Sequence, residues 1–180
     1  MGAGIPREEM TRRNRLASLP LQIFDCDNVL SDDGWRIKFI DWSQEDRFLR
    51  YDKYHQLCIY DRPGRVDLLP PERDAATVIF TAMPEFYRET REYWLESVGI
   101  KADLLLMRKT GDFRPSAKVK RDMLVELCFL ASRNVKDVVC AYDDHAAVVD
   151  MYKEVGINAT RIAIHDVCAY TNNLTGAKEE

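Results

Sequence analysis

The sequence has few of the features that mark fibrous, secreted or membrane proteins. Eight glycines and seven prolines in 180 residues are too few for a low-complexity chain. The five cysteines are odd in number, widely spaced and without a C-x-x-C pair, which favours reduced thiols over a disulfide framework or a zinc site. No run approaches the ~18 apolar residues of a membrane-spanning helix, and the charged N-terminus does not resemble a signal peptide. These absences predict a globular cytoplasmic protein.

The chain also lacks a strong excess of either charge. It has 26 lysines and arginines against 30 aspartates and glutamates, a formal net charge of −4. This balance argues against non-specific coating of nucleic acid, although a small basic cleft is compatible with it. The P-loop motif G-x-x-x-x-G-K-[ST] is missing, which excludes phosphorylation by that route.

The length fits one domain, which would bury roughly 70% of its unfolded surface. We expect this domain to span residues 19–170. Residues 1–18, with four arginines, are predicted to be a flexible or loosely docked arm. Residues 171–180, "TNNLTGAKEE", are predicted to be a disordered tail.

Five short apolar runs alternate with amphipathic helical patterns. The runs predicted to be strands are residues 21–24, 76–81, 103–107, 137–142 and 160–164, and the helical patterns are 84–99, 116–130 and 144–156. Continuous rather than alternating hydrophobicity is typical of strands covered on both faces. The order predicts an α/β fold with three layers, a parallel sheet with helices on both sides, that binds its ligand at the carboxyl ends of the strands.

Residues 31–74 interrupt this alternation. The segment is polar and aromatic, has no clear period, and is too long for a simple connection, so we expect a small cap inserted after the first strand. Its aromatic residues have two possible roles, stacking on a base or forming the small core of the cap. They are Trp42, Tyr51, Tyr54 and Tyr60.

The polar residues of interest follow the ends of the predicted strands. They are Asp25, Asp27, Thr81, Lys118, Lys120, Asp143 and Asp144. Parallel strands bring their carboxyl ends to one edge, so these side chains would share a site. Four carboxylates at one place require a cation, and a hard ion with oxygen ligands, Mg²⁺, fits best.

This set of residues suits phosphoryl transfer. Asp25 would attack phosphorus and form an aspartyl-phosphate, and Asp27 would protonate the leaving oxygen and then activate water. Thr81 would bind a phosphoryl oxygen, and a lysine at the start of the third helix, Lys118 or Lys120, would neutralise charge.

The metal ligands are predicted from the same group. Asp143 or Asp144 would hold Mg²⁺ together with Asp25 and the backbone carbonyl of Asp27. Which of the two neighbouring aspartates touches the metal stays open, because either one could also cap the following helix.

Four segments together resemble motifs I to IV of the haloacid dehalogenase (HAD) superfamily phosphatases. They are "FDCDNVL", "VIFTAM", "RPSAKVK" and "AYDDHAAVVDMYKEVGI", and they cover residues 21–164. The segments "YRETREYWLESVGI" and "LLLMRKTGDFRPSAKVK" further resemble the 3′-phosphatase domain of phage-type polynucleotide kinase/phosphatase. The resemblance implies a Rossmann-like HAD core.

The closer resemblance also implies roles for single residues. It places the lysine of the third motif at Lys120, and it gives Arg36 a contact with phosphate or substrate. Ala82 and Arg114 are expected to bind substrate, although Arg114 could instead neutralise Asp112. One departure is in the second motif, where Thr81-Ala82-Met83 replaces the usual Ser-Gly-Arg and removes an arginine.

The function expected from these observations is an Mg²⁺-dependent phosphomonoesterase acting on a nucleotide or on the 3′-terminal phosphate of a nucleic acid. One alternative is a 5′-nucleotidase for free nucleoside monophosphates, favoured by the acidic net charge and the missing arginine. An alternative of another class is a non-catalytic binding module on a HAD fold, which would be marked by loss of the nucleophile or the acid. Both residues are present.

Overall fold

The computed structural model describes residues 7–165. The expected disordered tail at residues 171–180 and the first six residues of the expected arm lie outside this range. Within residues 7–165, no helix is both long and apolar enough to cross a membrane.

A parallel sheet of five strands forms the centre of the domain. Its strands are β1 (Leu21–Asp25), β4 (Ala76–Pro84), β5 (Leu104–Arg108), β6 (Val138–Asp143) and β7 (Ala159–Arg161). Their order in the sheet is β5-β4-β1-β6-β7, and every neighbouring pair is parallel. The five predicted strands and the parallel sheet are confirmed. Because β1 is the middle strand, the residues after it reach the centre of the carboxyl edge.

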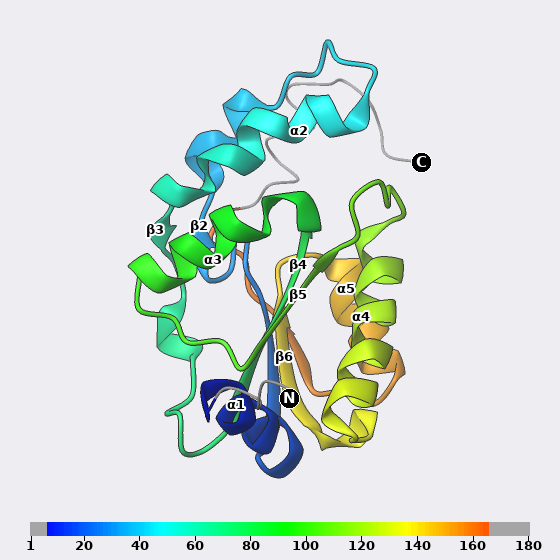
Figure 1. Ribbon diagram of the computed structural model, residues 1–180. Coiled ribbons are helices and arrows are strands. Elements are labelled where there is room, and N and C mark those ends of the chain that lie inside the picture. The colour runs from blue at the N-terminus through cyan, green and yellow to red at the C-terminus, as the bar shows by residue number, and fades with distance from the viewer. Residues whose placement is uncertain (1–6, 166–180) are drawn as a thin grey trace, which may run out of the picture.

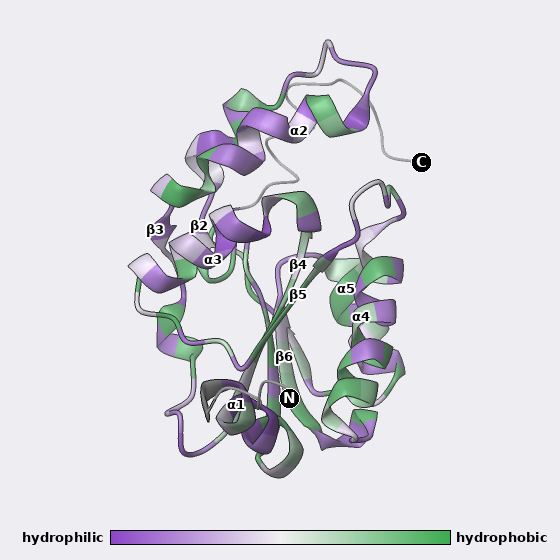
Figure 2. Cartoon of the chain, in the orientation of Figure 1, coloured by the Kyte–Doolittle hydropathy of each residue, from purple (hydrophilic) through white to green (hydrophobic). Residues whose placement is uncertain are grey.

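Helices cover both faces of this sheet, as predicted. On one face lie α4 (Ser116–Ala131) and α5 (Ala146–Glu154), and α3 (Arg88–Ser97) lies on the other (Figure 1). Two hydrophobic clusters fill the two spaces between the layers. Ile23 and Val78 point to the first cluster, whereas Phe24 and Ile79 point to the second, because successive side chains of a strand alternate in direction. Hydrophobic colour accordingly gathers on the central strands (Figure 2).

The N-terminal segment differs from the expected flexible or loosely docked arm. Residues Arg7–Ser18 form helix α1, which is joined to the domain at its last turn. Nε of Arg15 donates to Oδ1 of Asp103 at 2.6 Å, and Nη2 donates to the carbonyl of Ala75 at 2.9 Å. Leu16 is buried in the cluster beneath α4. A charged and an apolar anchor in the same helical turn explain why this segment is ordered.

Residues 31–74 form a group of short elements above the carboxyl edge of the sheet (Figure 1). They are β2 (Ser31–Asp32), β3 (Arg62–Pro63), the 3₁₀ turns η1 (Gly34–Phe39), η2 (Leu57–Tyr60) and η3 (Val66–Leu68), and helix α2 (Arg47–Gln56). Two further 3₁₀ turns lie in the core, η4 (Glu85–Tyr87) and η5 (Val135–Asp137). We call residues 31–74 the cap.

Helix α2 is the part of the cap that sequence reasoning did not resolve. Asp46 caps its N-terminus, since its carboxylate accepts hydrogen bonds from the backbone N–H groups of Phe48 and Leu49. None of its residues is fully buried, and its hydropathy is mostly hydrophilic (Figure 2). A helix with so little buried surface gives a weak periodic signal.

Candidate active site

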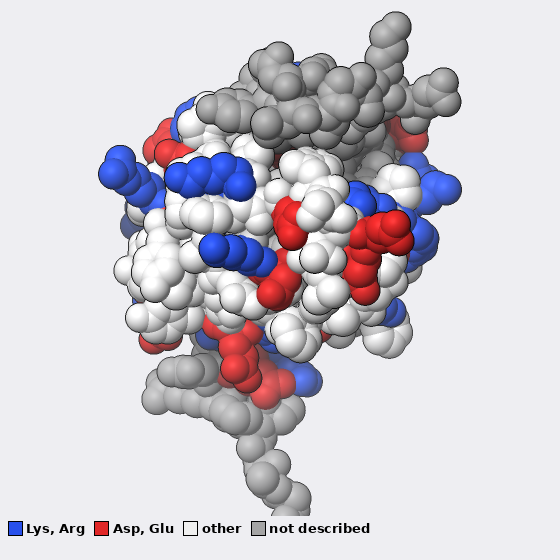
Figure 3. All heavy atoms as spheres, turned by 90° about the horizontal axis from the view of Figure 1, so that it is seen from above, with Lys and Arg blue, Asp and Glu red and all other residues white. Residues whose placement is uncertain are grey.

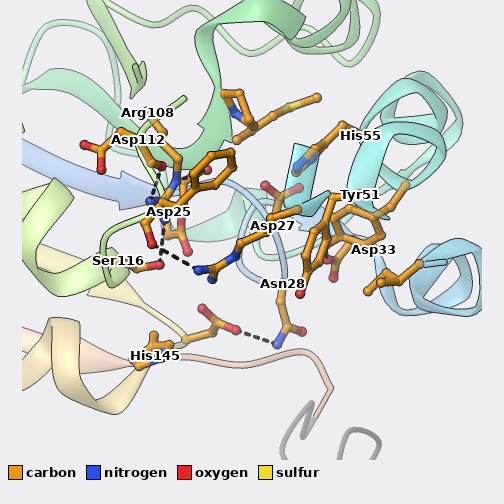
Figure 4. A pocket seen from close by; sticks show the side chains of 18 of the residues that line it. Asp25, Asp27, Asn28, Asp33, Tyr51, His55, Arg108, Asp112, Ser116 and His145 are labelled. Atoms are coloured by element: carbon orange, nitrogen blue, oxygen red, sulfur yellow. Dashed lines mark hydrogen bonds between the residues drawn. The ribbon is translucent and has the colours of Figure 1, made fainter. Parts of the chain in front are cut away.

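A pocket of about 330 Å³ opens at the carboxyl edge of the sheet, beneath the cap. Six predicted residues line it: Asp25, Asp27, Ala82, Lys120, Asp143 and Asp144. Figure 4 shows Asp25 and Asp27 between two walls, one with Tyr51, His55 and Asp33 and the other with Arg108, Asp112 and Ser116. The sheet therefore supplies the floor of the pocket, and the cap supplies one of its walls.

Lys120 joins two of the carboxylates on the floor. Its Nζ lies 2.7 Å from Oδ1 of Asp25 and 2.7 Å from Oδ2 of Asp143, and all three side chains are buried. Burial opposes a charge on Lys120, but Asp143 and Asp25 outweigh this and hold the pKa of the ammonium above its ordinary value. The backbone N–H of Cys26 donates to Asp25 Oδ1 at 2.8 Å. Asp25 is thus fixed by two donors.

Asn28 fixes the third carboxylate, that of Asp144. Its Nδ2 donates to Oδ2 of Asp144 and to the carbonyl of His165, both at 2.9 Å, and its Oδ1 accepts from the N–H of His165 at 2.8 Å. The backbone of Asn28 has φ of +59°, a left-handed conformation that asparagine tolerates better than most residues. The Asn28 side chain thus joins Asp144 to the segment after β7.

These carboxylates form a group that suits a divalent metal ion. One oxygen each from Asp25, Asp143 and Asp144 lies within 4.8 Å of the others. Burial raises the pKa of Asp25, Lys120 offsets part of that rise, and the charges of Asp143 and Asp144 add to it. Three carboxylates against one ammonium leave an excess of negative charge, which a cation with oxygen ligands would neutralise. The donor set therefore fits a hard divalent ion.

Asp27, in contrast, is bound by two cationic side chains. Its Oδ1 accepts a hydrogen bond from Nη2 of Arg91 at 2.5 Å and another from Nη2 of Arg36, and both arginine side chains are fully buried. The hydroxyl of Thr81 donates to its Oδ2 at 3.2 Å. Burial pushes the pKa of Asp27 upward, but the two guanidinium groups outweigh burial and hold that pKa well below its usual range. Asp27 is therefore held as a carboxylate.

The sequence also matches a known family of domains. Residues 73–166, more than half of the chain, match the family described as the phosphatase domain of polynucleotide kinase PNKP. The chain belongs to this family. It is a phosphatase domain of the HAD type, and its three-layer core with a cap after the first strand is the fold expected for one.

Solved structures show the same fold. A chain of the Pnkp1/Rnl/Hen1 RNA repair complex is 23% identical with a TM-score of 0.61, and the match covers 83% of this chain and 44% of that one. A second structure, of the Pnkp1/Rnl/Hen1 complex, is also 23% identical, with a TM-score of 0.60 and coverage of 81% and 46%. This PNKP-type domain thus spans less than half the length of both structural relatives. No curated protein sequence matches the chain.

In this PNKP-type domain, Arg36 lies in a different place from the one expected. Its side chain is fully buried, and Nε donates to both oxygens of Asp61 at 2.9 and 3.1 Å while Nη1 donates to the carbonyl of Tyr54 at 2.9 Å. With its remaining nitrogen on Asp27, the guanidinium is occupied by protein groups. The contact between Arg36 and phosphate or substrate that we expected is replaced by one that positions Asp27.

Thr81 and Ala82 end the buried part of β4. Thr81 is 0% exposed, and its hydroxyl accepts from the N–H of Met83 at 3.1 Å in addition to donating to Asp27. Ala82 lines the pocket, and its carbonyl accepts from Nε of Arg108 at 2.7 Å. Thr81 therefore contacts Asp27 directly, whereas Ala82 and Met83 line the pocket.

The structure shows where the residues of two alternatives left open by the sequence lie. Lys120 is buried at the carboxylates, whereas Lys118, on the same helix, is exposed. Arg114 pairs with Asp112 at 2.7 Å and with Asp122 at 2.8 Å on the surface. The neutralising role is therefore the one that the geometry of Arg114 supports.

Arg91 and Arg108 are site residues that sequence reasoning missed. Arg91 belongs to the buried stripe of α3 with Trp94 and Leu95. The feature of the sequence that could have identified it is an arginine at a position of the helix where an apolar residue is expected. Arg108 ends β5 and lines the pocket, and its Nη1 donates to the carbonyls of Asp112 and Arg114 at 3.0 and 2.6 Å. Arg108 thus holds the loop after β5 in place. The feature of the sequence that could have identified Arg108 is its position at the end of a predicted strand.

On the face seen in Figure 3, basic and acidic side chains are interspersed over the atoms that the figure colours by charge. No extended basic track is visible among them.

Proposed function

We propose that this chain is an Mg²⁺-dependent phosphomonoesterase that removes a 3′-terminal phosphate from a nucleotide or nucleic-acid end through an aspartyl-phosphate. The observation that supports this most is the pairing of Asp25 with Lys120 in the pocket, with Asp27 two residues on and two further carboxylates beside them. Membership in the PNKP phosphatase family supports the reaction class.

Asp25 is the nucleophile in this proposal. A bond forms between one of its carboxylate oxygens and phosphorus while the bond from phosphorus to the ester oxygen breaks. Lys120 and the N–H of Cys26 hold that carboxylate in one orientation. Water then attacks the phosphorus of the aspartyl-phosphate, which releases inorganic phosphate and restores Asp25.

Asp27 moves the protons in both steps. In the first step the leaving oxygen needs a proton, and in the second the attacking water must lose one. Arg36 and Arg91 hold free Asp27 in the ionised form, which is the form needed for the second step. Arrival of a phosphate dianion next to Asp27 would favour its protonation, because a neighbouring negative charge raises the pKa of a carboxyl group.

The metal site is proposed for Mg²⁺ because its donors are all oxygens. Asp25, Asp143, Asp144 and the backbone carbonyl of Asp27 would hold the ion. When bound, Mg²⁺ supplies positive charge to the phosphoryl oxygens as the bond to the leaving group breaks. Asn28 would keep the Asp144 carboxylate turned toward the ion.

The choice of a nucleic-acid end is supported by the family and by one structural relative, and the 3′ position is expected from the resemblance of the sequence segments to a 3′-phosphatase domain. The family is named for a polynucleotide kinase, and the relative is a component of an RNA repair complex. A 5′-nucleotidase remains the second candidate, because Met83 is buried where an arginine is usual and so adds no charge to the pocket.

The test is phosphate release from three substrates, each with Mg²⁺ and with EDTA. The substrates are an oligonucleotide with a 3′-phosphate, a nucleoside 3′-monophosphate and a nucleoside 5′-monophosphate, and Asp25→Asn is the blank. We expect metal-dependent release that is fastest from the 3′-phosphates. Faster release from the 5′-monophosphate would establish the nucleotidase, and no release from any of the three would contradict the proposal.

A further inference from the structure

The cap wall of the pocket is built largely from aromatic rings. Trp42, Phe48, Tyr51 and Tyr54 line the pocket from the cap, and Phe113 lines it from the loop after β5. The two sides are joined where Nη1 of Arg47 donates to the carbonyl of Phe113 at 3.0 Å. The charged floor thus lies below a largely aromatic chamber.

Two of these rings are occupied by other parts of the protein. The guanidinium carbon of Arg36 lies 4.0 Å from the centre of the Tyr54 ring, and the hydroxyl of Tyr54 donates to Asp33. The ring of Phe48 stacks on Tyr87 with centroids 5.8 Å apart. Both rings are therefore structural parts of the wall.

Trp42 and Phe113 are more exposed, although a guanidinium lies near each ring, that of Arg50 at 5.8 Å and that of Arg47 at 6.0 Å. One face of Tyr51 stacks on His55 with centroids 6.0 Å apart, which leaves its other face for a ligand. Trp42 and Tyr51 meet edge to face with centroids 6.2 Å apart, and the Trp42 side of this pair is 39% exposed. Phe113 is 47% exposed on the opposite side. Figure 4 shows Tyr51 on the cap wall of the pocket, and the carboxylates of the candidate metal site lie on its floor. A planar group attached to a phosphate on the floor would meet these rings.

We propose that this chamber holds the terminal nucleoside of the substrate by stacking its base against Trp42, Tyr51 and Phe113. The inference rests on the proposed function, because it assumes that the substrate phosphate lies at Asp25. A pocket of about 330 Å³ is at the lower end of the range for small ligands and has room for one nucleoside rather than several. Aromatic stacking accepts any base, so the chamber recognises a base without selecting its sequence.

The first arm of the test uses the unaltered protein and compares three phosphate esters. They are a nucleoside 3′-monophosphate, 2-deoxyribose 3-phosphate, which lacks the base, and the same nucleotide extended at its 5′ side by several nucleotides. We expect kcat/KM to be about 10-fold lower without the base, the change expected when one stacking contact is lost. Extension should change kcat/KM less than the base does, and the four bases should differ little.

The second arm uses variants of the cap. In Tyr51→Ala the ratio of kcat/KM on the nucleotide to kcat/KM on the base-free ester should fall about 10-fold. In Tyr51→Phe, which keeps an aromatic ring, this ratio should be close to that of the unaltered protein. Tyr60→Ala is the matched control, because Tyr60 is a cap tyrosine that is 67% exposed and outside the pocket lining. Its ratio should equal that of the unaltered protein. The Tyr51→Phe variant shows whether a loss seen in Tyr51→Ala comes from the missing ring or from a cap that fails to fold.

Two results separate this inference from the proposed function. If all three esters are hydrolysed equally and Tyr51→Ala leaves the ratio unchanged, the chamber does not recognise a base and the phosphatase still stands. If none is hydrolysed but calorimetry shows that the nucleotide binds in a Tyr51-dependent way, the base site stands and the proposed reaction is wrong. A strong dependence of kcat/KM on the length of the strand would also contradict the proposal that the chamber holds a single nucleoside.

Discussion

Asp25 and Asp27 are two residues apart in the sequence, yet their surroundings differ in charge. Asp25 shares its site with Lys120 and two more carboxylates, so that side of the pocket has an excess of negative charge. Asp27 is held by Arg36 and Arg91, and Asp61 also pairs with Arg36, so the charges on that side are nearly balanced. The comparison shows that a D-x-D motif does not by itself determine the ionisation of its two aspartates. Their ionisation is determined by residues that lie far away in the chain.

The largest expected effect on folding comes from removing the cation on the Asp25 side. Lys120→Met would leave Asp25 and Asp143 buried without their partner, and breaking a buried ion pair in this way costs about 3–5 kcal/mol. Urea unfolding of the variant without metal should show this loss of unfolding free energy.

Lys118→Met is the control for this variant, because Lys118 lies on the same helix but is exposed. Its unfolding free energy should stay within about 0.5 kcal/mol of the unaltered protein. An equal loss in both variants would mean that the effect comes from helix α4 and not from the carboxylates.

The corresponding change on the other side is Arg91→Met. Asp27 would keep Arg36 and lose one charge-assisted hydrogen bond, so the expected loss of stability is smaller, about 1.5–3 kcal/mol. We also expect kcat to fall more than KM rises, since Asp27 acts on the reacting oxygens. Arg121→Met, which breaks a surface pair with Glu154, should change neither quantity. Unchanged kcat in Arg91→Met would show that Arg91 does not position Asp27.

His55, which lies near Asp27, should make the stability of the protein depend on pH. Burial, aided by the nearby charges of Arg36 and Arg91 and opposed by Asp27, lowers the pKa of His55 to about 3. In the unfolded chain the pKa is about 6.5, so unfolded protein binds more protons below that pH and stability is lost as pH falls from 6.5 toward 3. At pH 5.5 the loss due to His55 should be about 1.4 kcal/mol.

This loss is measured as a difference between the unaltered protein and His55→Gln, because Asp33 pulls the other way. Burial and the charge of Asp27 raise the pKa of Asp33 to about 6, although Arg36 opposes the shift, so its protonation stabilises the fold as pH falls below that value. Subtracting the His55→Gln curve of unfolding free energy against pH leaves the contribution of His55. Parallel curves between pH 7 and 5 would contradict the prediction.

The smallest effect is expected for Asn28→Ala on the Asp25 side. Losing the hydrogen bond that orients Asp144 should weaken Mg²⁺ binding about 10-fold, as is usual when a residue that orients a metal ligand is removed. Calorimetric titration with Mg²⁺ alone measures this directly. Asn28→Gly, which suits the left-handed backbone, separates loss of the side chain from backbone strain and should show the same weakening.

The sequence was sufficient for the parts of the structure that local pattern controls. The strands were readable because they are continuously apolar, and Asp25 and Asp143 were readable because acids at the ends of such strands are unusual. The structure brings these residues together with Lys120, because parallel strands share one carboxyl edge. Their roles in the reaction stay predictions.

The parts that were not predicted depend on long-range contacts. The order of α1 comes from Arg15 meeting Asp103, 88 positions away in the chain, which no local pattern reports. The family resemblance assigned Arg36 to the substrate, and its pairing with Asp61 could not be read from the sequence because Asp61 lies in the cap, which has no clear period. Arg91 lies on a helix that was predicted correctly, but its contact with Asp27 crosses 64 positions.

The most direct test of the account is to trap the phosphorylated protein during turnover. A substrate labelled with ³²P in its 3′-phosphate is mixed with the protein and Mg²⁺, quenched in acid within milliseconds, and digested for peptide analysis. The account predicts label on the peptide containing Asp25, released by hydroxylamine and missing in Asp25→Asn. Turnover without label on that peptide, or label retained in Asp25→Asn, would contradict the assignment of Asp25 as the nucleophile.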